Sequence, residues 1–254
     1  MAEEREGADW HRVQAVAGAS RHPVARLRGS AGADRRVISG IVHVLKSGGR
    51  WADAPPVYGP RKTLYNRFVR WAAKGVWEDI FHALAAAGGP PAQVMIDSTA
   101  VRAHRSASGG KGGKRAQAIG RSRGGRTTKI HALSDPLGRP LAFLLTSGQV
   151  ADCTAADRLL DRMPATDLLH GDKGYDSAAV RRKIEEARAA PNIPPRANKR
   201  WKNCFSPYLY RNRNVIERMF GRLKDFRRIA TRYDRSATNF MAAVHIVATV
   251  AYWL

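Results

Sequence analysis

Cysteine and targeting signals are scarce in this sequence. Only two of its 254 residues are cysteine, Cys153 and Cys204, and they stand in no paired or metal-binding spacing. This argues against a disulfide framework and predicts a reducing compartment. No basic stretch followed by an apolar run opens the sequence, so we expect no secretion signal. Asn239 and His245 interrupt the apolar tail, which predicts a packed terminal helix and no membrane contact.

Negative charge is also scarce. The chain has 44 Lys and Arg against 21 Asp and Glu, a formal net charge of +23. Such self-repulsion is expected where the partner is a polyanion, because cationic contacts to phosphates release counterions. The charge therefore predicts a nucleic-acid partner, and cytoplasm in contact with DNA, without indicating any chemistry.

The N-terminal third divides in two. Residues 1–33 show no convincing period and predict a poorly ordered segment. Residues 34–90 predict three short helices separated by Gly and Pro turns, beginning near Asp34, Thr63 and Val76. This pattern is typical of a small all-α, helix-turn-helix-like domain.

The second of these helices has a polar face suited to DNA. Its side chains are of the types that contact phosphates and base edges, while Leu64, Phe68 and Trp71 can pack inward. The plainer interpretation is a solvated charged helix, since a charge stripe is weak evidence. The predicted DNA-contacting residues are Lys62, Asn66, Arg67 and Arg70.

Residues 91–254 predict a mixed α/β domain. A short buried strand, 94–96, ends on Asp97, and two further strands, 128–134 and 141–146, flank a turn at Asp135–Gly138. A helix over 152–163, a strand over 168–172, a helix over 177–190 and an edge strand over 192–196 follow. Helices over 208–228 and from Thr238 complete a sheet with helices packed on it.

Residues 102–129 stand apart in composition. They contain nine Lys or Arg and seven Gly, and no acid occurs from Ser98 to Ser134. Glycine at that density predicts a basic loop that closes on a DNA backbone, although a tolerated disordered insertion has the same composition. The predicted DNA contacts in this loop are Lys111, Lys114, Arg115, Arg121, Arg123, Arg126 and Lys129.

A polar group of side chains lies near the C-terminus. Tyr210, Arg213, Glu217 and Lys224 are three, four and seven residues apart. On an α-helix they fall within an arc of about 60°, beside a buried apolar face. A carboxylate escorted by cations suits metal-dependent phosphoryl transfer, and a solvated polar edge is the plainer alternative.

Three acids can meet in the predicted fold. Asp97 and Asp172 each end a strand, and Glu217 lies on the late helix. Clustered carboxylates need a counter-charge at neutral pH, and Mg²⁺ prefers oxygen ligands. The eight His and two Cys show no zinc-type spacing. Asp135 and Asp152 are rival acids, but the first fits a turn and the second a helix N-cap.

These motifs resemble a known family. Ile96–Thr99 with Val101–His104, then Gly171–Asp176, then Tyr210, Arg213, Glu217 and Lys224, are similar to the DDE transposases of bacterial insertion sequences, in particular the insertion sequence five group. The resemblance spans about residues 34 to 254. Residues 1–33 do not match the ordered, aromatic-rich helix with which family members begin.

The resemblance implies a ribonuclease H-like fold with Asp97, Asp172 and Glu217 as metal ligands and catalytic residues. Two Mg²⁺ ions are expected, with Mn²⁺ as a substitute. Tyr210, Arg213 and Lys224 would position terminal phosphates, and Lys173 would contact DNA beside Asp172. The implied reaction cuts double-stranded DNA at the element's terminal repeats and joins the 3′-hydroxyl ends to target DNA, which requires at least a dimer.

Two alternatives stay open at this point. A non-catalytic DNA-binding remnant or domesticated descendant would bind DNA without metal. A ribonuclease or junction nuclease on the same fold would share the acids without needing the basic loop or the helix-turn-helix.

Overall fold

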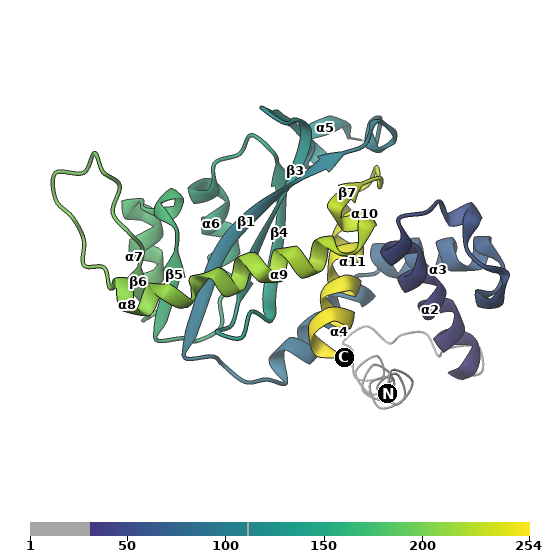
Figure 1. Ribbon diagram of the computed structural model, residues 1–254, viewed down its shortest axis with the longest axis horizontal. Coiled ribbons are helices and arrows are strands. Elements are labelled where there is room, and N and C mark those ends of the chain that lie inside the picture. Colours follow the sequence, from purple (N-terminus) through teal and green to yellow (C-terminus); the bar gives the residue numbers. More distant parts are fainter. Residues whose placement is uncertain (1–30, 111) are drawn as a thin grey trace.

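The computed structural model describes residues 31–110 and 112–254, and the prediction for the first 30 residues lies outside them. Figure 1 shows a sheet with helices on both faces and a helical group to one side. The α-helices are α2 Ala31–Ser47, α3 Arg61–Ala73, α4 Val76–Ala86, α5 Gly113–Ala116, α6 Asp152–Leu160, α7 Ala178–Glu186, α8 Pro207–Tyr210, α9 Asn214–Lys224, α10 Arg227–Ala230 and α11 Ala237–Ala248. The strands are β1 Gln93–Ala103, β2 Gly120–Ser122, β3 Gly125–Ser134, β4 Pro140–Ser147, β5 Leu168–Gly171, β6 Ala190–Asn192 and β7 Thr231–Arg232.

The sheet is mixed, as predicted. Its seven strands follow the order β2-β3-β1-β5-β6, with β4 pairing β3 and β7 pairing β1. Strands β1, β3 and β4 pair antiparallel, whereas β1, β5 and β6 pair parallel. The edge strand predicted over 192–196 lies instead at Ala190–Asn192, where its residues pair with β5.

The prediction that the first strand ends on Asp97 is wrong. Strand β1 continues to Ala103 because β3 pairs with it as far as Arg102 and β7 pairs with its last two residues. Only the parallel ladder with β5 stops near the acid, at Ile96 opposite Gly171. Ser98 and Thr99 are therefore strand residues.

The side chains on the two faces of β1 pack into two separate hydrophobic cores. Met95 and Val101 belong to a large cluster with α9, α11 and the N-terminal helices, whereas Val94 and Ile96 belong to a smaller cluster with α6 and α7. This alternation follows from the two-residue period of a strand. Asp97 shares the face of Met95, and Ser98 shares that of Ile96.

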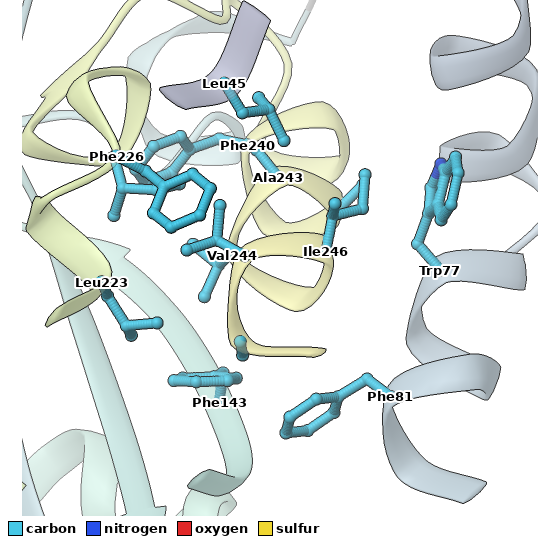
Figure 2. Packing of buried hydrophobic residues seen from close by; sticks show 14 of the residues in the cluster. Leu45, Trp77, Phe81, Phe143, Leu223, Phe226, Phe240, Ala243, Val244 and Ile246 are labelled. Atoms are coloured by element: carbon cyan, nitrogen blue, oxygen red, sulfur yellow. The ribbon is translucent and has the colours of Figure 1, made fainter. Parts of the chain in front are cut away.

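The N-terminal helices share a core with the C-terminal ones. Figure 2 shows side chains of α4, β4 and α9 gathered around α11, with Phe81 close to Phe143. The apolar residues of α2, α3 and α4 are buried in this same cluster, so the described part of the helical region has no separate core. The three predicted helices are present, and the chain is already helical at Ala31, the first described residue.

Residues 102–129 are not one continuous loop. Strand β1 covers the first two, β2 and β3 form a hairpin through Ser122–Gly125, and α5 is a single turn. Buried Arg232 helps to hold this segment, since its guanidinium donates to Thr128 Oγ1 at 2.8 Å. Pairing with the sheet offsets the conformational entropy that its glycines would otherwise favour.

The C-terminal tail packs as predicted. Helix α11 is almost wholly buried and continues into a π-helical turn at Thr249–Trp253. Within residues 31–110 and 112–254, no helix combines the length and apolar character needed to cross a membrane.

A buried ion cluster fixes the segment after β5. Asp176 is 1% exposed and accepts from Arg181 Nε at 2.9 Å, from Lys199 Nζ at 2.8 Å and from the Arg196 amide at 2.8 Å. Burial acts to raise the pKa of Asp176, but these donors outweigh it and lower that pKa to about 2. The cluster therefore holds Lys173–Tyr175, a 3₁₀ turn that follows Asp172, against the chain after β6.

We predict that Asp176→Asn lowers the free energy of unfolding by about 3 kcal/mol at pH 7, because it leaves buried Arg181 without its counter-charge. A carboxylate whose folded pKa is depressed stabilises above its unfolded pKa of about 3.9 and loses that contribution as pH falls towards 2. Urea unfolding should show the difference between wild type and variant shrinking below about pH 4. Equal stabilities at pH 7 would contradict this role.

Candidate active site

Two of the predicted acids lie side by side at the end of the parallel ladder. Ile96 pairs with Gly171, and Asp97 and Asp172 are the next residues of the two chains. Neighbouring strands are about 4.8 Å apart, so the two carboxylates leave the sheet close together. Asp172 Oδ1 also accepts from the Gly174 amide at 2.8 Å, which fixes its side chain at the start of the 3₁₀ turn. Asp172 therefore both opens this turn and lies beside Asp97.

Helix α9 brings the third acid to the same place. In Figure 1 this helix crosses one face of the sheet and passes in front of β1. Arg213, at its N-cap, donates to Asp97 Oδ2 at 3.0 Å and to Glu217 Oε1 at 2.5 Å. Asp97 thus lies beside Asp172 in the sheet and shares Arg213 with Glu217, and the catalytic role of the three acids stays a prediction.

The environments of the acids differ. Asp97 is 17% exposed at its side chain and Glu217 is 56% exposed. Burial, helped by the charge of Asp172, raises the pKa of Asp97, although the Ser98 amide and Arg213 oppose the shift. A carboxyl with a raised pKa gains from a cation placed beside it.

Tyr210 and Lys224 flank the acids along the helical segment. The Tyr210 ring centre lies 5.5 Å from the Arg213 guanidinium carbon, and burial raises the pKa of its phenol. Lys224 Nζ donates to Thr99 Oγ1 at 2.6 Å, and burial lowers the pKa of this ammonium group. Both groups lie on the side of β1 that carries Asp97.

The single helix predicted over 208–228 is wrong in detail. Helices α8 and α9 are separated by a 3₁₀ turn at Arg211–Arg213. Phe226 has an extended backbone and separates α9 from α10. The apolar face is confirmed, with Ile216, Met219, Phe220, Leu223 and Phe226 buried. Tyr210 and Arg213 meet across the 3₁₀ turn, and Arg213 reaches Glu217 one turn further along α9.

Asp152 was predicted to be an N-cap, and this is wrong. Ala151 holds that position without a side-chain bond, and Asp152 turns to the sheet instead. Its Oδ1 accepts from Ser98 Oγ at 2.7 Å and Lys129 Nζ at 3.0 Å. Since Ser98 and Asp97 point to opposite faces, Asp152 is not part of the acidic group at Glu217.

The same contact engages Lys129, one of the predicted DNA-contacting residues, within the protein. Its side chain is 19% exposed and is paired within the protein. Arg67 is also engaged, because it donates to buried Asp34 at 2.5 Å and stacks over Trp71. Each of these two cations pairs with an acid of the protein, and its contact with DNA stays a prediction.

The other described candidates remain available at the surface. Lys62, Asn66 and Arg70 are exposed along α3, and Lys173 is exposed beside Asp172. Arg121 and Arg126 face each other across the β2–β3 hairpin, Arg123 lies in its turn, and all three are exposed. Lys111 and the side chains of Lys114 and Arg115 lie outside the described residues.

One group of possible metal ligands was not predicted from the sequence. Glu78, His82 and His245 bring one ligand atom each within 4.8 Å of one another. The i, i+4 spacing of Glu78 and His82 was visible in the sequence, but His245 is 163 positions beyond His82 and only the fold reveals it.

Two families match this chain. The family described as "Transposase DDE domain" matches residues 88–254, and that described as "Putative transposase of IS4/5 family" matches residues 6–81. The second match begins well before Asp34, so the prediction that residues 1–33 depart from the family pattern is wrong for most of that segment.

Relatives agree with this result. A "Putative transposase for insertion sequence element IS6501" of Brucella ovis is 34% identical over 129 residues, which are 50% of this chain and 98% of the relative. A "Putative transposase for insertion sequence element IS402" of Burkholderia cepacia is 31% identical over 137 residues, 50% of this chain and 63% of that protein.

A solved structure shares the fold. The piggyBac transposase, seen in a synaptic complex with hairpin DNA, superposes with a TM-score of 0.57 at 9% identity, covering 88% of this chain and 65% of that one. This likeness concerns the fold alone, a ribonuclease H-like mixed sheet flanked by helices. By its sequence, the chain belongs to the DDE transposases of bacterial insertion sequences.

Proposed function

We propose that this protein binds the terminal inverted repeats of an insertion sequence, cleaves a phosphodiester bond at each end and joins the freed 3′-hydroxyl ends to target DNA. The observation that carries the proposal is the meeting of Asp97, Asp172 and Glu217 beside Arg213 and Lys224. Carboxylates for metal and cations for phosphate are thus present within one surface site.

The donor set fits magnesium. Asp97, Asp172 and Glu217 offer only oxygen, and the exposure of Glu217 leaves the site open to a large polymer. Two Mg²⁺ ions, or Mn²⁺ in their place, would supply activation of the attacking oxygen and stabilisation of the leaving oxygen when bound. The three carboxylates would hold them, with Arg213 withdrawn from between Asp97 and Glu217.

The neighbouring side chains bind and orient DNA in this proposal. Arg213 exchanges its carboxylate partners for a phosphate, which guanidinium binds in a bidentate manner. Lys224 holds a second phosphate further along β1. Tyr210 is protonated at neutral pH, since burial raises the pKa of its phenol further above 7, and it can donate a hydrogen bond to DNA. No covalent protein–DNA intermediate forms in this proposal, so Tyr210 is not the nucleophile.

The exposed basic residues extend the contact. Helix α3 offers Lys62, Asn66 and Arg70 for recognition of the terminal repeats, and the β2–β3 hairpin offers Arg121, Arg123 and Arg126 for the backbone. Joining two ends requires at least two copies of the chain on DNA. The site of action is the bacterial nucleoid, in the cytoplasm.

A DNA-binding remnant is the second candidate. Pairing of Asp97 and Glu217 with Arg213 is also the arrangement expected of acids that no longer hold metal. Only measurement of cleavage separates the two, because both bind DNA.

Glu217→Gln should lower end cleavage by more than about 100-fold, the effect of losing even an outer-shell partner of a metal. DNA affinity should be unchanged or slightly raised, because the variant removes a negative charge. Cleavage and gel-shift assays on one labelled duplex measure both. Glu185→Gln, an exposed change on α7, is the matched control, and normal cleavage by Glu217→Gln would rule out the assignment.

Arg213→Gln should strengthen metal binding and slow cleavage. It removes a cation from between two ligands, so the half-saturating Mg²⁺ concentration should fall by about fivefold. The maximal cleavage rate should fall as well, because phosphate loses its guanidinium partner. A magnesium titration of the cleavage rate provides both values, and a raised magnesium requirement would contradict the proposed exchange.

Replacing Arg121, Arg123 and Arg126 together with Gln should weaken DNA binding and flatten its salt dependence. Each lost phosphate contact reduces the slope of log K against log salt by about 0.9, so three reduce it by about 2.7. Replacing exposed Arg158, Arg182 and Arg188 of the α6–α7 side is the control. Equal slopes for the two triple variants would remove the hairpin from the DNA interface.

A further inference from the structure

A second group of metal-binding side chains lies on the helices. Glu78 and His82 stand one turn apart on α4, and His245 comes from α11. The distance from His82 Nε2 to Glu78 Oε1 is 3.6 Å, and one ligand atom from each of the three residues lies within 4.8 Å of the others. Glu78 and His82 are about 40% exposed, whereas His245 is 1% exposed.

His245 is the residue that needs an explanation. Its Nε2 is buried and has no hydrogen-bond partner among the described residues. The ring stacks on Phe81 at 5.0 Å between centroids, which fixes its orientation. An unpaired polar atom in a core is destabilising unless something binds it.

An ion pair with Glu78 does not account for this arrangement. Burial lowers the pKa of His245 to about 3, so its imidazole is neutral and keeps a free lone pair at pH 7. The neighbouring His82, together with charges that include Arg162, lowers the pKa of Glu78 to about 2 against the effect of burial, so its carboxylate is ionised at pH 7. Neutral imidazole and ionised carboxylate are the protonation states that a metal ion requires.

We propose that Glu78, His82 and His245 bind a Zn²⁺ ion that links α4 to α11. Two imidazole nitrogens and one carboxylate oxygen form a common three-ligand set for zinc and leave a fourth position for water. Tetrahedral ligands about 2.0–2.1 Å from zinc lie about 3.4 Å apart, so the three ligand atoms need to approach one another by at most about 1.4 Å.

The donor chemistry separates this site from the acidic one. Imidazole suits zinc and its neighbours in the transition series, whereas Asp97, Asp172 and Glu217 offer the oxygen that magnesium prefers. Glu78 and His245 also line an open pocket of about 510 Å³, which gives the ion a path from solvent. Arg162 Nη1, 3.3 Å from Glu78 Oε1, is the cation that zinc would have to outcompete.

The position of the group points to a structural role. Helix α4 belongs to the helical region and α11 is the C-terminal helix, and both contribute to the large core. Zinc bound between them would fasten the region that carries α3 to the domain that carries the acids. It would do so without touching DNA or the reacting phosphate.

The test is zinc binding by the full chain stripped with EDTA. After addition of Zn²⁺ and gel filtration, metal analysis should find one zinc per chain, which Mg²⁺ at the same concentration does not displace. Zinc at about 100 times its Kd should raise the Tm by about 5–10 °C. Co²⁺ in the same protein should give the visible absorption of a four-coordinate site with nitrogen ligands.

Three variants locate the ion. His82→Gln should lose the zinc and the Tm rise, and its partly exposed position avoids disturbance of the core. His245→Phe should do the same while keeping an aromatic ring against Phe81. Arg162→Gln should bind zinc more tightly, because it removes the competing cation.

Two controls make the outcome decisive. His104→Gln changes an exposed histidine outside the group and should keep the zinc. Asp97→Asn should also keep it, so failure of the DNA-cleavage proposal and failure of the zinc proposal are told apart. Absence of retained zinc in the wild type, or equal loss in His82→Gln and His104→Gln, would overturn the proposal.

Discussion

Repulsion between carboxylates is the constraint on which this active-site region depends. The sheet places Asp97 and Asp172 side by side, and α9 adds Glu217 on the same face. Arg213 reduces that repulsion, because its guanidinium pairs with both Asp97 and Glu217. Such a bridge stabilises the acids, and in the proposed mechanism a metal ion takes its place when the site binds phosphate.

The rest of the fold fixes the members of this group relative to one another. The apolar face of α9 is buried against β1 and α11, so the polar edge with Arg213 and Glu217 has one orientation over the sheet. Asp172 is held by its 3₁₀ turn, which the buried Asp176 cluster ties to the chain after β6. The N-terminal helices pack into the same core as α11, so the exposed face of α3 and the acidic site belong to one packed unit.

Much of this could be predicted because the signals were local. The period of the helices, the Asp135 turn and the spacing of Arg213 and Glu217 each depend on nearby residues, and the structure bears them out. The errors came from long-range contacts. Strand β1 continues beyond Asp97 because β3 and β7 pair with it. Asp152 is not an N-cap because its carboxylate accepts hydrogen bonds from Ser98 and Lys129 instead. Arg67 pairs with Asp34, which is 33 residues away in the sequence. His245 lies near His82 only because tertiary packing brings their helices together.

The most direct measurement is cleavage of a labelled duplex that carries the element's own ends, with magnesium or with EDTA, by wild type and by Asp97→Asn. The account predicts nicking at the element ends that requires magnesium and that Asp97→Asn loses while still binding the duplex. Tight binding without cutting by either protein would contradict it and would identify the chain as a DNA-binding remnant.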